Sequence, residues 1–155
     1  MDDNDFRTFS EYMKSGNNSI TASMEDYLEM ICRLSSETNF TRIHDLAKAL
    51  NVHPPSVTRM VQRLGKLNLI QYEKYGVIIL KDDGRKLGEY LLNRHRVVET
   101  FLKLLGVSEE NILYETEKIE HTISKETTLC FSKYISFIND NQDVADRFNI
   151  YKETK

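Results

Sequence analysis

Two short helices joined by a tight turn and followed by a hairpin are the most constraining pattern in this sequence. Apolar residues recur at helical spacing over residues 42–50 and again over residues 54–67. Strand-like runs at residues 69–73 and 77–80 then flank a short turn. Helix, turn, helix and hairpin in this order predict a winged helix-turn-helix domain, whose second helix enters the major groove of DNA.

Local signals support both helices. Thr41 is a suitable N-cap for the first helix, since its hydroxyl can accept a hydrogen bond from a free backbone N–H. Pro54 and Pro55 fit the first turn of the second helix, where the N–H that proline lacks has no helical partner. The residues from Asn51 to His53 are therefore expected to form the connecting turn.

The charge of the chain is strongly segregated. The net charge is −3, but residues 40–96 carry a net +6 between a net −5 in residues 1–39 and a net −4 in residues 97–155. A basic middle segment is typical of a DNA-binding module, because lysine and arginine neutralise phosphates. Acidic flanks suit the binding of cations.

The second helix carries small polar and basic side chains that suit DNA. Serine and threonine can bond several bases, arginine favours guanine, glutamine favours adenine, and a proline ring can pack on a thymine methyl group. The predicted base contacts are Pro55, Ser56, Arg59 and Gln62, with Thr58 and Arg63 on the same face. The predicted phosphate contacts are Thr41, Arg42, Lys66 and the wing residues Lys74 and Tyr75. The alternative for any single one of them is a solvated basic face.

The rest of the chain is expected to be helical, so the fold class is mostly α with a small β wing. The predicted N-caps of three further helices are Asp82 or Asp83, Ser108 and Ser124, and Gly106 is predicted to end the first of these helices. The expected organisation is an N-terminal arm (residues 1–21, with a short helix at 4–14), a winged helix-turn-helix domain (22–82) and an all-α dimerisation domain (83–155) that ends in a short helix or a frayed tail. Surplus apolar surface on the last helices predicts a homodimer, as a palindromic DNA operator requires.

Three segments outside the helix-turn-helix carry side chains that can ligate metal. Glu117, Glu120 and His121 have the spacing i, i+3, i+4, which places them on one side of a helix where they can converge on one point. Asp26 and Glu29 repeat the i, i+3 spacing in a helix expected at about residues 23–37, and His95 with Glu99 offers a further pair. The alternative for Asp26 is structural, because Ser23 and Asp26 together resemble a capping box.

Composition narrows the class of protein. Hydrophobic residues make up 40% and charged residues 29%, as in an ordinary globular protein. The acidic N-terminus has no signal-peptide pattern, and no apolar run approaches the roughly 20 residues of a membrane span. Cys32 and Cys130 lack metal-type spacing and suit reduced thiols. We expect a soluble cytoplasmic protein without a membrane partner or a small organic substrate.

Five motifs together resemble one known family. They are the runs Ser23–Glu29, Val52–Val61, Tyr72–Tyr75, Arg94–His95 and Ile119–His121, and their order and spacing agree over about residues 22–140. This pattern resembles the manganese transport regulators, which form the MntR branch of the diphtheria toxin repressor (DtxR) family.

The resemblance implies a set of metal ligands and a metal. By it the ligands fall on Asp26, Glu29, His95, Glu117, Glu120 and His121. It further implies two Mn²⁺ ions per subunit, with Glu117 and Glu120 bridging. Iron-responsive members have methionine and cysteine at the positions of Asp26 and Glu117, and hard oxygen ligands suit Mn²⁺ better than soft sulfur does.

The chain also departs from the family pattern. Thr122 stands where the branch often has a second histidine, and about 20 N-terminal residues are absent from the shortest members. The chain stops before the third domain of the iron-responsive members, so no ancillary ligands are expected from there. Glu99 matches an ancillary ligand of those members and is expected here to support the ligands from outside the metal site or to be structural.

The predicted function is a Mn²⁺-activated repressor of manganese uptake genes rather than an enzyme. One alternative is an iron-responsive repressor of the same family. A second is a metal-independent winged-helix regulator that answers to a small apolar ligand. A di-metal carboxylate enzyme would need paired Glu-x-x-His motifs, but Glu117 has Glu120 three residues later, which argues against that class.

Overall fold

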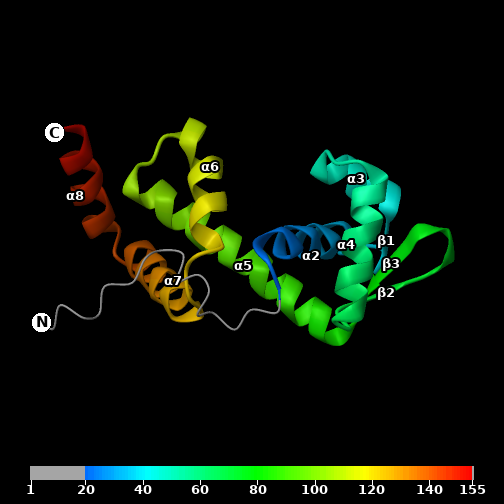
Figure 1. Ribbon diagram of the computed structural model, residues 1–155. Coiled ribbons are helices and arrows are strands. Elements are labelled where there is room, and N and C mark those ends of the chain that lie inside the picture. Colours follow the sequence, from blue (N-terminus) through cyan, green and yellow to red (C-terminus); the bar gives the residue numbers. More distant parts are fainter. Residues whose placement is uncertain (1–19, 155) are drawn as a thin grey trace, which may run out of the picture.

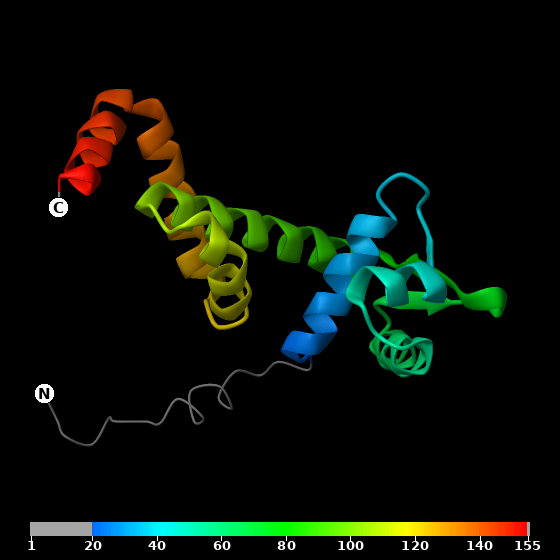
Figure 2. The ribbon, with the colours of Figure 1, turned by 90° about the horizontal axis from the view of Figure 1, so that it is seen from above.

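The computed structural model describes residues 20–154, except for the side chain of Lys74. The short helix predicted at residues 4–14 lies outside this part of the chain. Two lobes are joined by one long helix, α5 (Asp82–Leu105), which runs from beneath the first lobe into the second (Figure 1). Seen from above, the hairpin and the C-terminal helix lie at opposite ends of the molecule (Figure 2).

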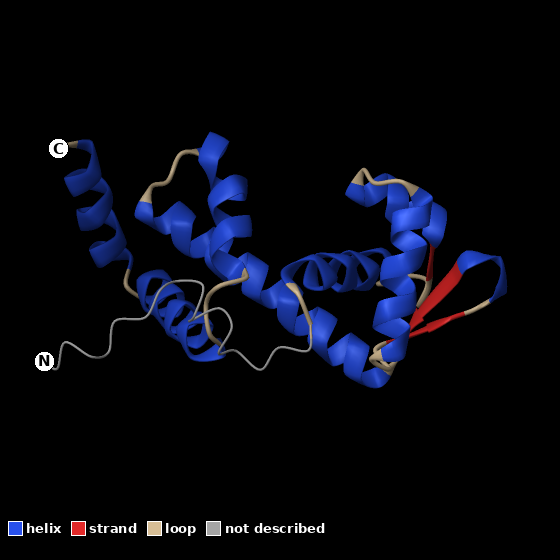
Figure 3. Cartoon of the chain, viewed as in Figure 1, coloured by secondary structure: helices blue, strands red, loops and turns tan. Residues whose placement is uncertain are grey.

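The N-terminal lobe is a winged helix. Its helices are α2 (Ala22–Leu34), α3 (Ile43–Leu50) and α4 (Pro54–Lys66), and its strands are β1 (Thr41–Arg42), β2 (Ile70–Tyr72) and β3 (Val77–Leu80). The strands are confined to this lobe (Figure 3), where β3 lies between β1 and β2 and is antiparallel to both. The fold class predicted from the sequence is confirmed.

The turn between α3 and α4 follows the predicted chemistry. Asn51 ends α3 in the left-handed conformation at φ 53°, which asparagine tolerates better than most residues. Pro54 and Pro55 occupy the first turn of α4 as predicted. The N-cap role predicted for Thr41 is wrong, because Thr41 pairs with Ile78 in β1 and Arg42 is the cap residue of α3.

The start of α2 also corrects the sequence prediction. Thr21 is the N-cap, and its hydroxyl accepts a hydrogen bond from the Met24 N–H at 3.3 Å. Ser23 lies inside the helix, so the proposed capping box with Asp26 does not form. The side chain of Asp26 is therefore not engaged in capping.

The N-terminal lobe has an apolar core, and α5 packs against it. Apolar side chains from α2, α3, α4 and the sheet meet in it, including Leu28, Ile31, Leu46, Val57, Val61, Leu64, Ile70 and Ile78. Two glycines let α5 approach closely. A Cβ at Gly84 would lie 1.8 Å from the Leu69 carbonyl oxygen, and a Cβ at Gly88 would lie 2.8 Å from Cys32 Cβ. The first turns of α5 are thus fixed against the DNA-binding lobe.

The C-terminal lobe consists of α6 (Glu109–Glu120), α7 (Lys125–Asp140) and α8 (Gln142–Glu153). The helices α6 and α7 pack along α5, and α8 packs on α7, with Lys152 reaching the end of α5. Gly106 ends α5 at φ 90° and Ser124 caps α7 through the Thr127 N–H, as predicted. The cap predicted at Asp82 or Asp83 is wrong, because Lys81 is the cap residue and both aspartates lie in the first turn. Their charges still favour that end of the helix dipole.

Large apolar side chains remain exposed on the C-terminal lobe. They include Leu113 and Tyr114 on α6, Leu129 and Phe137 on α7, and Ile150 on α8. The surplus apolar surface predicted for these helices is therefore present within one subunit. Over the described residues, no helix is both long and apolar enough to cross a membrane.

Candidate metal centre

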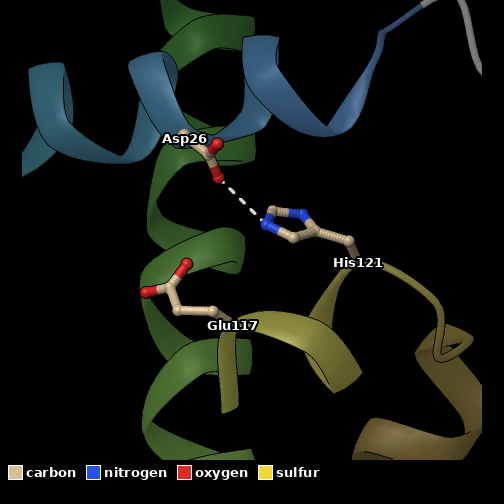
Figure 4. Close-up of side chains that lie close together, drawn as sticks. All are labelled: Asp26, Glu117 and His121. Atoms are coloured by element: carbon tan, nitrogen blue, oxygen red, sulfur yellow. Dashed lines mark ion pairs between the residues drawn. The ribbon is translucent and has the colours of Figure 1, made fainter. Parts of the chain in front are cut away.

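The six ligands predicted by resemblance come from three helices. Asp26 and Glu29 lie on α2, His95 lies on α5, and the others lie at the C-terminal end of α6, where His121 is the first residue beyond the helix. All three helices meet where α2 crosses α5. The close-up in Figure 4 shows the side chain of Asp26 on α2 facing those of Glu117 and His121, which come from the C-terminal end of α6. Folding therefore gathers six side chains that are up to 95 positions apart in sequence.

The ligand-capable atoms form two groups of three. One group is Asp26, Glu117 and His121, and the other is Glu29, His95 and Glu120; within each group the atoms lie within 4.8 Å of one another. The spacing in α6 had predicted convergence on one point. Instead, Glu117 and Glu120 are assigned to different groups.

Glu117 and Glu120 each lie near both groups. Glu120 places one carboxylate oxygen 3.1 Å from His95 Nδ1 and the other 3.7 Å from the Nε2 of His121. Glu117 Oε1 is 3.9 Å from His95 Nδ1. Two carboxylates between two clusters have the arrangement that a pair of neighbouring cations needs for shared ligands.

Crowding of carboxylates perturbs their protonation. Burial raises the pKa of Glu29 and the pKa of Glu117, and the negative charge of Glu120 raises both further. The hydrogen bond with Glu120 raises the pKa of His95, against the opposing effect of burial. These shifts have one physical origin, which is an excess of negative charge in a partly buried volume.

His121 is the most strongly perturbed group. Its Nε2 lies 2.9 Å from Asp26 Oδ1, and its Nδ1 lies 2.8 Å from Glu25 Oε2. Hydrogen bonds with Asp26 and Glu25 raise the pKa of His121 to about 10, so the metal-free imidazole is protonated at neutral pH. A cation that binds Nε2 has to displace that proton, as metal ligation of histidine generally requires.

The donor set fits divalent metal. Four carboxylates and two imidazoles are ligands that suit Mn²⁺, and no thiol is among them. Arg33 pairs with Glu29 at 3.0 Å, whereas the ion-pair partners of Asp26, Glu117 and Glu120 are the two imidazoles, an arrangement that metal ions could complete. A cavity of about 270 Å³, lined by Asp26, Glu29, His95 and Glu117 among others, leaves the cluster open to solvent.

Sequence reasoning missed two residues beside the ligands. Glu25 on α2 accepts hydrogen bonds from Arg94 Nη2 at 2.7 Å and from His121 Nδ1 at 2.8 Å. Although burial raises the pKa of Glu25, these two partners lower it below its usual value on balance. The Arg94 side chain is only 5% exposed. In the sequence the available signal was only that Arg94 directly precedes the predicted ligand His95; its burial, which calls for an anionic partner, is a property of the fold.

Glu99 lies apart from both groups. It forms an ion pair with Lys103 one turn later on α5, at 2.7 Å, and this hydrogen bond lowers the pKa of Glu99. The geometry agrees with the structural role expected from the sequence.

The predicted DNA-reading residues are distributed over α4 and the wing. Pro55, Arg59, Gln62 and Arg63 are exposed on α4, whereas Ser56 and Thr58 are half-buried and Thr58 donates its hydroxyl hydrogen bond to the Pro54 carbonyl. Arg42 is exposed at the base of the sheet, and Tyr75 is 92% exposed at the wing tip; the Lys74 side chain is outside the described part of the structure.

Thr41 does not reach this surface. Its residue is 4% exposed within β1, so its hydroxyl is not available for the predicted phosphate contact in this conformation. Sequence reasoning had placed it on an exposed helix end, because the two-residue strand β1 carries no alternating pattern that could be recognised.

Comparison with known proteins identifies both lobes. Residues 19–78 match the family model of the iron dependent repressor N-terminal DNA binding domain. Residues 81–148 match the model of the iron dependent repressor metal binding and dimerisation domain. The first match ends within β3, and the second begins one residue before α5.

Relatives of known role agree. The chain is 52% identical to the HTH-type transcriptional regulator MntR of Geobacillus kaustophilus over 104 residues, which are 67% of this chain and 74% of that protein. It is 40% identical to MntR of Oceanobacillus iheyensis over 135 residues, covering 86% of this chain and 92% of the relative. Both are transcriptional regulators rather than enzymes, in agreement with the prediction.

Solved structures show the same fold. The manganese regulator SloR superposes with a TM-score of 0.64 at 30% identity, over 74% of this chain and 54% of that chain. The metal-dependent transcriptional regulator MtsR superposes with a TM-score of 0.68 at 28% identity, over 76% of this chain and 55% of that chain. This chain thus spans little more than half the length of these two structures. With both domains matched in order, the chain belongs to the iron-dependent repressor family, also called the diphtheria toxin repressor family, in its MntR branch.

Proposed function

We propose that this chain is a Mn²⁺-activated repressor of manganese uptake genes that holds two Mn²⁺ ions per subunit. The proposed ligands are Asp26, Glu117 and His121 for one ion and Glu29, His95 and Glu120 for the other, with Glu117 and Glu120 shared. The observation that carries the proposal is the meeting of these six side chains, from three helices, in two adjacent groups. When bound, the ions supply the positive charge that the clustered carboxylates lack.

The ligands lie at the junction between the two lobes. Asp26 and Glu29 belong to the DNA-binding lobe, and Glu117, Glu120 and His121 belong to the helices proposed to form the dimer. Without metal, carboxylate repulsion loosens this junction and lets the two DNA-binding lobes of the dimer sample many separations. Bound metal restricts these two lobes to a spacing that fits two half-sites, which lowers the ordering cost of binding DNA.

Hard carboxylate oxygens dominate the proposed ligands, and this chemistry suits Mn²⁺. The group around His121 has two carboxylates and one imidazole, and so does the group around His95. Raw affinity still favours later divalent metals, so selectivity depends on which ions produce the active geometry. The Mn²⁺ content of the dialysed protein, measured by electron paramagnetic resonance, is expected to be two per subunit; one would contradict the paired site.

Asp26 is expected to influence which metal activates the protein. Asp26→Met replaces a hard anionic ligand with a soft thioether, so we expect fewer bound ions and a weaker preference for Mn²⁺ over Fe²⁺. Thr21 and not Asp26 caps α2, so the substitution removes no helix cap. The free energy of unfolding of the metal-free protein should therefore fall only by the contribution of the partly exposed Asp26–His121 ion pair, about 1 kcal/mol at most. Operator affinity titrated with each metal checks this, and an unchanged metal ranking argues against Asp26 as a ligand.

DNA recognition is proposed to use α4 for bases and the wing for phosphates. Arg59→Ala and Gln62→Ala should each cost roughly 1–3 kcal/mol on the operator and leave non-specific binding nearly unchanged. Lys74→Ala should weaken binding to all sequences alike and reduce the salt slope by about one. Binding isotherms on specific and random DNA at several salt concentrations separate the two classes. Full operator affinity in Arg59→Ala would exclude α4 as the reading helix.

A further inference from the structure

We propose that Glu25 is the positioning residue of the metal centre: its carboxylate holds the His121 imidazole through Nδ1, so that Nε2 is the nitrogen presented to metal. This inference rests on the proposed function and extends it to a residue outside both ligand groups. Glu25 itself donates nothing to metal; it acts through His121.

The two edges of the His121 ring have different partners. Nδ1 lies 2.8 Å from Glu25 Oε2. Nε2 lies 2.9 Å from Asp26 Oδ1, as the dashed line in Figure 4 marks, and 3.7 Å from Glu120 Oε1. With a carboxylate facing each nitrogen, both nitrogens carry a hydrogen in the protonated ring. Glu25 is not a proposed ligand and keeps the Nδ1 hydrogen, so a cation that binds Asp26 and Glu120 would replace the hydrogen on Nε2. The ring edge that meets two proposed ligands is therefore the edge that is able to bind a cation.

Glu25 is itself held in place. Arg94 Nη2 donates to the same oxygen, Oε2, at 2.7 Å, and both side chains are largely buried, at 5% exposure for Arg94 and 12% for Glu25. The Arg94 Nε has no hydrogen-bond partner among the described residues, so Nη2 provides its contact with Glu25. Two donors that share one acceptor lie close together, which accounts for the 3.4 Å between Arg94 Nη2 and His121 Nδ1.

His121 needs such support because of its position. It is the C-cap residue of α6, at the point where the helix gives way to the turn before α7. The hydrogen bonds from Arg94 and His121 to Glu25 connect His121 to α2 and, through Arg94, to α5. Partners of this kind fix the tautomer and the orientation of a metal-binding histidine in many sites.

A purely structural role for Glu25 is the competing explanation, since the ion pair with Arg94 also joins α2 to α5. Nitrogen NMR tests the proposed ring geometry without any substitution. In Zn²⁺-loaded protein with ¹⁵N-labelled histidine, we expect His121 to keep a proton on Nδ1 and to bind metal through Nε2. Ligation through Nδ1 would overturn the proposal, and this arm remains decisive even where a variant fails to fold.

A double-substitution cycle measures the coupling. Glu25→Gln should weaken Mn²⁺ binding, followed by electron paramagnetic resonance, by roughly 10–100-fold. In the His121→Ala background the same change should weaken it by less than about threefold, since its target is gone. Glu89 is an exposed carboxylate on α5, and Glu89→Gln serves as the control. It should leave the Mn²⁺ affinity unchanged in both backgrounds.

The outcomes of this cycle are distinct. Equal losses in both backgrounds would mean that Glu25 acts through the fold, and the positioning role would be wrong. Unchanged Mn²⁺ affinity in Glu25→Gln would overturn it as well. If the unsubstituted protein bound no Mn²⁺, the proposed function itself would fail, which is a different result from either of these.

Discussion

Glu120→Gln is expected to abolish Mn²⁺-dependent operator binding while leaving the metal-free fold intact. Glu120 is 1% exposed, and its carboxylate lies 3.1 Å from His95 and 3.7 Å from His121, so it serves both proposed metal positions. Glutamine keeps the shape and a hydrogen-bond acceptor for His95 but removes the charge. Loss of a shared ligand should weaken Mn²⁺ binding by more than about 100-fold, beyond the effect of outer-shell partners.

The metal-free protein should tolerate this change. Removing one buried carboxylate relieves the repulsion that raises the pKa values of Glu29 and Glu117, which offsets part of the lost interaction with His95. We expect the free energy of unfolding of the metal-free protein, measured by thermal denaturation, to change by about 1–2 kcal/mol. Glu110→Gln, on an exposed part of the same helix, is the matched control and should retain full Mn²⁺ activation. Normal Mn²⁺ activation of Glu120→Gln would exclude Glu120 as a ligand.

Gly84→Ala should be strongly destabilising. The added Cβ would lie 1.8 Å from the Leu69 carbonyl oxygen and 2.7 Å from its carbon, and these are backbone atoms that cannot rotate away. The same carbonyl accepts the Lys81 N–H at 3.0 Å, so moving it also breaks the entry to α5. We expect a loss of about 3 kcal/mol or more, at the upper end of overpacking effects, or roughly 10 °C in Tm.

Gly65→Ala is the control for this prediction. Gly65 lies within α4, and its nearest neighbour is 3.9 Å from the added Cβ, an ordinary contact. Alanine is the better helix former, so stability should rise by about 0.5–1 kcal/mol. Calorimetry of both variants without metal provides the measurement. A Gly84→Ala protein as stable as the original would mean that α5 does not approach the N-terminal lobe this closely.

The predictions that relied on regular periodicity were confirmed. The helix-turn-helix, its prolines and the hairpin are encoded by residues close together in sequence, so local chemistry was sufficient. Capping was predicted less well. Thr41, Ser23 and Asp82 all have side chains that can cap a helix, yet none of them is the cap residue. Which residue becomes the cap depends on tertiary contacts, such as the pairing of Thr41 in β1 with Ile78 in β3.

The candidate site was predictable in its members but not in its arrangement. Helical spacing gathered Glu117, Glu120 and His121, and the family resemblance added the ligands from α2 and α5. The division into two groups follows from how α2 crosses α5, which no spacing rule contains. Glu25 escaped notice because its significance depends on contacts with Arg94 and His121, which lie 69 and 96 positions away.

The central claim is that metal binding controls operator affinity. The most direct test is the affinity of the full chain for a palindromic site selected from random DNA, measured at fixed salt with Mn²⁺ and with chelator. We predict at least about tenfold tighter binding with Mn²⁺, within the range of typical coupling energies between sites. Equal affinity under the two conditions, in a protein that binds DNA, would contradict the account.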